Sequence, residues 1–210
     1  MDGILKALVT LLVVVDPIGL APLFAALTYG GSPSYCRRMA VRGTAIAALI
    51  LVIFMFAGQA LLRILGIGLP AFRIAGGALL FLLAIDMVFA RQSGLRSTTE
   101  REQEEAGQRN DISVFPLAIP LIAGPGAITT VLLMSGSAEQ GPMGVIVRLV
   151  VLFAVLLLAL GALLLTTRIM RIMGETGANT FTRTSGIILA ALAVQFMIDG
   201  LLAIIGPHLK

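Results

Sequence analysis

Two short proline–glycine motifs interrupt the apolar stretches of this 210-residue chain, and they hold the groups best suited to bind a small molecule. A proline inside a helix removes a backbone donor and clashes with the carbonyl four residues before it. A neighbouring glycine lowers the cost of leaving helical geometry. Each motif therefore predicts a break at which one helix ends and another begins. The motifs are Asp16-Pro17-Ile18-Gly19 and Gly124-Pro125-Gly126-Ala127.

A helix that restarts at such a break presents backbone N–H groups and the positive end of its dipole. Both features can hold a carboxylate. Asp16 is expected to cap the helix that begins at Pro17, and it supplies a negative charge for an ammonium group or a coupling cation. Thr129 and Thr130, one turn beyond Pro125, add hydroxyl donors. These groups fit a zwitterion, although two proline kinks relieved by local packing would give the same pattern.

The composition around the motifs is that of an integral membrane protein. Apolar residues make up 58% of the chain and charged residues 12%, with a mean hydropathy of +1.02. A soluble domain has about a quarter of its residues charged, so a water-soluble fold is excluded. The basic residues fall in short connections between apolar segments, so we expect no nucleic acid as a partner. The partners that we expect are the lipid bilayer and a small-molecule substrate. A single cysteine excludes an internal disulfide and a cysteine-based metal cluster, and we expect no metal or prosthetic group.

Six segments are long and apolar enough to cross a bilayer, which takes about 20 residues. Lysine and arginine are concentrated in the first, third and fifth connections, which places these in the cytoplasm and both termini on the outer side. The polar stretch 91–112 is then a cytoplasmic linker. The predicted spans are Ile4–Thr28, Gly43–Leu65, Pro70–Ala90, Ser113–Met134, Gly144–Thr167 and Thr184–Ile205.

The two halves of the chain carry matching landmarks. The prolines of the two motifs are 108 positions apart, and Arg73-x-x-Gly76 recurs 110 positions later as Arg183-x-x-Gly186. Each half has three spans, an odd number, so the second half must enter the membrane from the opposite side. The sequence therefore predicts a single all-α membrane domain of six helices in two inverted repeats, residues 1–90 and 113–210, with broken first and fourth helices.

Other polar side chains within the spans are weaker candidates for function. Gln195 lies about halfway along the sixth span and is expected to face the helix bundle. Arg73 and Arg183 are typical of interfacial anchors, but either could form a gating or ion-coupling pair with Asp86 or Asp199.

Motifs in the first, third, fourth and sixth spans resemble the MarC family of small bacterial and archaeal inner-membrane proteins. The resemblance covers nearly the whole chain and implies a multi-pass protein of the inner membrane. It rests on Asp16-Pro17-Ile18-Gly19 with Pro22, Arg73-Ile74-Ala75-Gly76-Gly77, the segments 116–120 and 123–130, and the segment 183–196.

Because the family includes the SnatA-type transporters, the resemblance implies transport of small neutral amino acids such as glycine or alanine, coupled to a gradient of H⁺ or Na⁺. A structural or regulatory membrane protein whose breaks are packing kinks is the alternative. An enzyme is not expected, because the sequence has no H-E-x-x-H motif and no nucleophile elbow.

Overall fold

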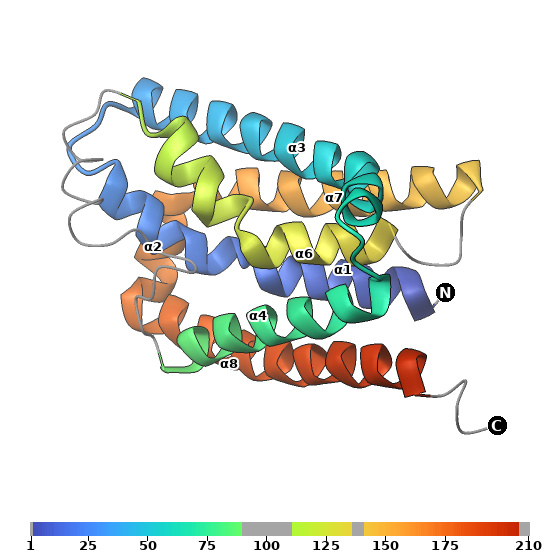
Figure 1. Ribbon diagram of the computed structural model, residues 1–210. Coiled ribbons are helices and arrows are strands. Elements are labelled where there is room, and N and C mark those ends of the chain that lie inside the picture. Colours follow the sequence, from blue (N-terminus) through green and yellow to red (C-terminus); the bar gives the residue numbers. More distant parts are fainter. Residues whose placement is uncertain (1, 90–110, 136–140, 206–210) are drawn as a thin grey trace.

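The computed structural model describes residues 2–89, 111–135 and 141–205, and no strand occurs within these ranges. Most of the predicted linker 91–112 lies outside them. Figure 1 shows the helices side by side along one common direction, as in a membrane-spanning bundle. The elements are α1 (Asp2–Val15), α2 (Pro17–Leu27), α3 (Pro33–Ile64), α4 (Leu69–Phe89), η1 (Ser113–Ile122), α6 (Pro125–Ser135), α7 (Pro142–Leu164) and α8 (Thr166–Ile205).

The helices confirm the predicted all-helical membrane fold. Among the described residues, five segments are long and apolar enough to cross a membrane, the first of them being α1 and α2 taken together from Ala7 to Leu27. A sixth crossing is formed if η1 and α6, which meet at an angle of 59°, count as one broken span. Within η1 the backbone leaves helical geometry at Phe115 and Ile119, each of which precedes a proline.

Two helices begin earlier than their predicted spans. α3 starts at Pro33 rather than Gly43, because the Ser32 side chain accepts a hydrogen bond from the Tyr35 N–H and a proline fits the first helical position. α8 begins at Thr166 and changes direction at Gly174, which has a φ of +62°. Basic residues assigned to the first and fifth connections therefore lie in helices, namely Arg37, Arg38, Arg42, Arg168, Arg171 and Arg183.

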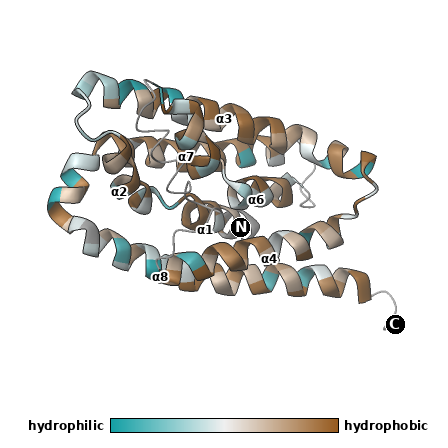
Figure 2. Ribbon diagram, turned by 60° about the vertical axis from the view of Figure 1, so that its left-hand side comes forward, coloured by the Kyte–Doolittle hydropathy of each residue, from teal (hydrophilic) through white to brown (hydrophobic). Residues whose placement is uncertain are grey.

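The two broken spans occupy the centre of the bundle. Within the most apolar window of α1 and α2, 44% of the residues are buried in the protein, against 17% for the span Thr176–Ile205 of α8. Nearly all of α6 is buried as well. Figure 2 shows apolar residues over the middle of the outer helices, with hydrophilic residues toward the start of α3 and the bend of α8. Asp16 and Gly19 of the first break and Gly124, Gly126 and Ala127 of the second are thus buried within the bundle.

Glycines let the central spans approach the outer helices closely. α3 runs parallel to η1 and α6: a Cβ built on Gly43 would lie 2.5 Å from Leu117 Cδ2, and one on Gly58 would lie 1.8 Å from Leu132 Cδ2. A glycine on one helix therefore receives a leucine from the other, which is how membrane helices obtain close contact.

α4 and α8 pack against each other in antiparallel fashion through a second set of glycines. Gly77 lies against the backbone of Ala193, Gly186 against that of Ala84, and Gly200 against that of Pro70 (a residue of α4). Each added Cβ would lie between 2.8 and 3.1 Å from a carbonyl oxygen of the partner helix. Because backbone atoms form these contacts, the neighbouring helix cannot yield by changing a rotamer.

Gly77→Ala is expected to destabilise this helix pair. The new methyl group would lie 2.8 Å from the Ala193 carbonyl oxygen and 2.6 Å from Met197 Cγ. Overpacking of this kind costs about 1–3 kcal/mol, and we expect the melting temperature in detergent to fall by roughly 5 °C. Gly161→Ala is the matched control, because no atom lies within 4 Å of its added Cβ. Equal melting temperatures for the two variants would contradict the proposed contact.

Candidate functional site

The two predicted breaks lie next to each other at the centre of the bundle. A Cβ built on Gly126, in the first turn of α6, would lie 3.1 Å from Val14 Cγ1, at the end of α1. Figure 1 shows α2 and α6 starting near the middle of the molecule and running in opposite directions. The first turn of α6, which carries the positive end of its dipole, therefore lies beside the end of α1, two residues before Asp16.

Asp16 forms the first break and is the only described residue other than glycine with a positive φ. Its backbone has φ 45° and ψ 71°, a left-handed conformation that aspartate tolerates better than most residues. Its Oδ1 accepts a hydrogen bond of 3.0 Å from the Gly19 N–H, so the predicted cap of α2 is confirmed. The side chain is 1% exposed.

A hydroxyl from the other end of the chain also binds Asp16. Thr182 Oγ1, in α8, donates a 2.8 Å hydrogen bond to Asp16 Oδ2. Gly19 lies directly beside this pair: a Cβ there would be 2.1 Å from Asp16 Oδ2 and 2.5 Å from Thr182 Oγ1. Asp16, Gly19 and Thr182 thus form a compact cluster that joins α2 to α8, which we call the Asp16 cluster.

The second break is built differently. Gly124 and Ala127 are buried, whereas Pro125 is exposed. The Thr130 hydroxyl donates to the Gly126 carbonyl at 2.8 Å and so satisfies its own helix. The buried Thr129 places its methyl group against Gly76 of α4.

Gly126 itself packs against apolar side chains. An added Cβ would lie 2.9 Å from Leu83 Cδ2 and 3.2 Å from Leu80 Cδ2. Its small size therefore allows α6 to approach α1 and α4. In the first break, Pro17 and Ile18 are half-buried.

Gln195 does not face the bundle as expected. Its side chain is exposed on α8, where Nε2 donates a 2.7 Å hydrogen bond to Asp199 Oδ1 one turn later. The sixth span has a glycine side, at Gly186 and Gly200, that packs on α4, and Gln195 lies on a different side of the helix. Hydrophobicity could not distinguish the two sides, because lipid and protein interior are both apolar.

The four charged gating candidates lie along the α4–α8 pair. Gly200 packs against Arg73 Cβ, so Arg73 lies beside the turn that carries Asp199. Gly186 packs against Met87, so the turn carrying Asp86 lies near the beginning of the α8 span, where Arg183 is exposed. The structure thus places these residues in two groups near opposite ends of the helix pair, and the group with Arg183, which follows Thr182, adjoins the Asp16 cluster.

A charged contact outside the apolar core anchors the start of η1. Asp111 accepts hydrogen bonds from the Ser113 hydroxyl and from the Ser113 N–H, the latter at 2.9 Å, and forms a 2.7 Å ion pair with Arg42. The Ser113 hydrogen bonds, with smaller contributions from Arg42 and Arg38, hold the pKa of Asp111 below its usual value. Asp111 is therefore ionised at neutral pH and connects η1 to the first turns of α3.

A family model described as the MarC family integral membrane protein matches residues 1–205. This chain belongs to the MarC family. A UPF0056 membrane protein of Aquifex aeolicus is 38% identical over 196 residues, which is 93% of this chain and 91% of the relative. A UPF0056 membrane protein of Archaeoglobus fulgidus is 39% identical over 194 residues, covering 91% and 89% of the two chains. The inner membrane protein YhgN of Escherichia coli K12 is 36% identical over 207 residues, covering 96% and 97%.

The names of these MarC relatives describe membrane proteins and give no activity. No solved structure matches the chain. The MarC assignment therefore confirms the family resemblance and the membrane location of the chain, whereas the function has to be argued from the two breaks.

Within this MarC chain, the residue that sequence reasoning missed is Thr182. Its signal is weak, since it is one of several hydroxyl residues that precede the apolar part of α8.

Proposed function

We propose that this MarC protein is a secondary transporter of small neutral amino acids such as glycine or alanine, with its binding site between the two breaks. The observation that carries the proposal is the packing of the first turn of α6 against the end of α1, two residues before the buried carboxylate of Asp16. The first N–H groups of a helix have no acceptor within that helix, so those of α6 can hold a substrate carboxylate. Asp16 supplies the negative charge for an ammonium group or a coupling cation, H⁺ or Na⁺.

The packing pattern supports an inverted repeat of three helices. α3 packs on η1 and α6, and its counterpart α7 packs on α1 and α2. α2 contacts α8, and its counterpart α6 contacts α4. The pair α4 and α8 completes the pattern, since a twofold axis in the membrane plane would exchange these two antiparallel helices. We place the protein in the inner membrane, with both termini on the outer side, as the distribution of basic residues favours.

In the conformation described, the polar groups of both breaks are engaged within the protein. Asp16 is bound by Gly19 and Thr182, and Thr130 by its own helix. Transport by alternating access then requires α8 to move relative to α2, which would release Thr182 from Asp16. The hydrogen bond between Thr182 and Asp16 is therefore the contact that we expect to change during the cycle.

Uptake into liposomes tests the proposal. Purified protein should accumulate radiolabelled glycine or alanine under an imposed H⁺ or Na⁺ gradient, and should not accumulate glutamate or lysine, whose extra charge the site does not balance. Protein-free liposomes are the control. A folded protein that moves none of these amino acids under either gradient would contradict the proposal and favour a structural or regulatory role.

A further inference from the structure

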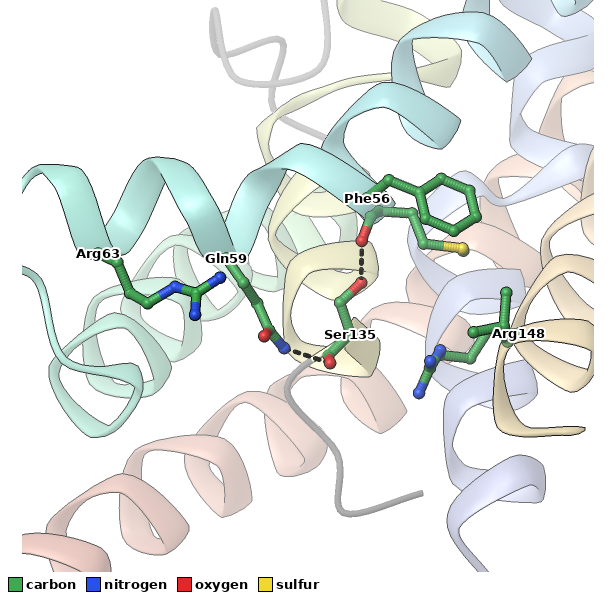
Figure 3. A pocket seen from close by; sticks show the side chains of 7 residues that line it. Phe56, Gln59, Arg63, Ser135 and Arg148 are labelled. Atoms are coloured by element: carbon green, nitrogen blue, oxygen red, sulfur yellow. Dashed lines mark hydrogen bonds between the residues drawn. The ribbon is translucent and has the colours of Figure 1, made fainter. Parts of the chain in front are cut away.

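A cavity of about 140 Å³ lies at the far end of α6, away from the two breaks. Its polar lining comes from three helices: Gln59 and Arg63 from α3, Ser135 from the end of α6, and Arg148 from α7. Figure 3 shows the two arginines on opposite sides of the cavity, with Gln59 and Ser135 between them. Arg63 and Arg148 are the charged residues among the described residues that line the cavity.

Hydrogen bonds hold the base of this cavity in place. The Ser135 hydroxyl donates to the Met55 carbonyl at 2.6 Å, and the Gln59 amide nitrogen donates to the Ser135 carbonyl. These bonds fix the end of α6 to α3, which carries Arg63, and α3 also packs on α7, which carries Arg148. A cationic site with a fixed geometry is better suited to bind an anion than two independent surface arginines are.

With the central break at the bilayer midplane, as its place within the span predicts, the cavity falls in the lipid headgroup region. Ser135 is ten residues beyond Pro125, which is about 15 Å from the central break at the helical rise of 1.5 Å per residue. Half of a typical hydrocarbon core is also about 15 Å thick. Arg63 lies one further turn outward along α3 from Gln59, at the level where phosphate groups occur.

Apolar side chains extend from the cavity toward the centre of the membrane. Phe56 lines the cavity and is 56% exposed. Ile53, one turn before Phe56 on α3, is also exposed and continues the apolar surface along this helix. A ligand with an anionic headgroup and hydrocarbon chains can contact both the arginines and the apolar surface, whereas a small soluble anion can bind only to the arginines.

We propose that this cavity binds the phosphodiester group of an anionic membrane phospholipid. Arg63 and Arg148 hold the phosphate oxygens from two sides, and the acyl chains lie along α3, against Phe56 and Ile53. Guanidinium groups bind phosphate with paired, charge-assisted hydrogen bonds, which lysine cannot reproduce. The bound lipid would join the second and fifth spans of the protein and does not depend on the transport function proposed above.

Native mass spectrometry of the detergent-solubilised protein tests the site with phosphatidylglycerol as the probe. We expect the Arg63→Gln/Arg148→Gln variant to bind this lipid at least about tenfold more weakly, since a hydrogen bond to a charged group contributes enough to change affinity by that factor. Arg63→Lys/Arg148→Lys should lose less affinity, because it keeps the charges. Arg168→Gln/Arg171→Gln, which removes two arginines from the far side of the bundle, should bind as the parent does. The single variant Arg63→Gln alters an exposed side chain and serves if the double variant does not fold.

Three results would overturn the proposal. The first is unchanged binding by the Arg63→Gln/Arg148→Gln variant, or by Arg63→Gln alone where only that variant folds. The second is an equal loss of binding in the Arg168→Gln/Arg171→Gln control, which would indicate a general effect of charge. The third is binding of glycerophosphoglycerol or inorganic phosphate as tight as that of phosphatidylglycerol, which would assign the site to a soluble anion. Weak binding of both soluble anions, with arginine-dependent binding of the lipid, is the expected outcome.

Discussion

Replacing Asp16 by leucine is expected to lower the melting temperature of the detergent-solubilised protein by roughly 10 °C. The change removes the acceptor of the buried Gly19 N–H and of the half-buried Thr182 hydroxyl. A buried donor left without a partner costs about 1–3 kcal/mol, and the loss of the Thr182 hydrogen bond adds a smaller cost. Leucine also tolerates the positive φ of this position poorly.

Asp16→Asn separates the structural role of this residue from the role of its charge. Asparagine keeps an oxygen that accepts from the Gly19 N–H and tolerates the left-handed conformation, and the Thr182 hydroxyl can turn to accept from its amide. We therefore expect a melting temperature within about 3 °C of the parent, and at least tenfold slower amino acid uptake in liposomes. Normal uptake by the asparagine variant would show that the carboxylate charge takes no part in transport. A leucine variant that melts with the parent would remove Asp16 from the structural argument as well.

The second large effect is expected for Gly19→Ala. The added methyl group would lie 2.1 Å from Asp16 Oδ2 and 2.5 Å from Thr182 Oγ1, which is closer than non-bonded atoms can approach. The Asp16 and Thr182 side chains must then move, which breaks the hydrogen bond that joins α2 to α8. We expect the melting temperature to fall by roughly 10 °C, since this bond is lost, the cap is disturbed and the site is overpacked.

Two further variants calibrate this result. Thr182→Val keeps the shape of the side chain but removes one donor, so it should have a smaller effect, about 1–2 kcal/mol. Gly68→Ala adds a methyl group in the connection between α3 and α4, where only Pro70 Cδ lies within 4 Å, at 3.7 Å, and it should melt with the parent. The melting temperatures of the variants are ranked by following the loss of the helical circular dichroism signal on heating. A Gly19→Ala protein as stable as the Gly68→Ala control would contradict the close packing of the Asp16 cluster.

Local chemistry explains which features could be predicted from the sequence. Proline and glycine act on their own backbone, so the breaks at Pro17 and Pro125 could be located from residue types alone. The cap by Asp16 could be predicted for the same reason, because donor and acceptor are three residues apart. Span lengths followed from the thickness of the bilayer.

Features that depend on distant contacts could not be predicted in this way. No local pattern in the sequence links Thr182 to Asp16, 166 positions away. The sequence also gave no means to tell which side of α8 faces lipid, and Gln195 was expected on the wrong side for that reason. The sequence does indicate that the helix is interrupted in η1, because Pro116 and Pro120 each remove a backbone donor. It does not indicate which backbone conformation replaces the helix there.

The hydrogen bond between Thr182 and Asp16 also has a consequence for biosynthesis. Asp16 enters the membrane with the first span, when the ribosome has not yet made the residue that completes its binding. A charged side chain at the centre of a bilayer costs about 3 kcal/mol, so the nascent first span is less stable than the finished one. Its stability is completed only when α8, the last of the described helices to be synthesised, packs against α2. A helix made late therefore completes the environment of one made early, and a chain that ends after α7 lacks the Thr182 hydroxyl that binds Asp16.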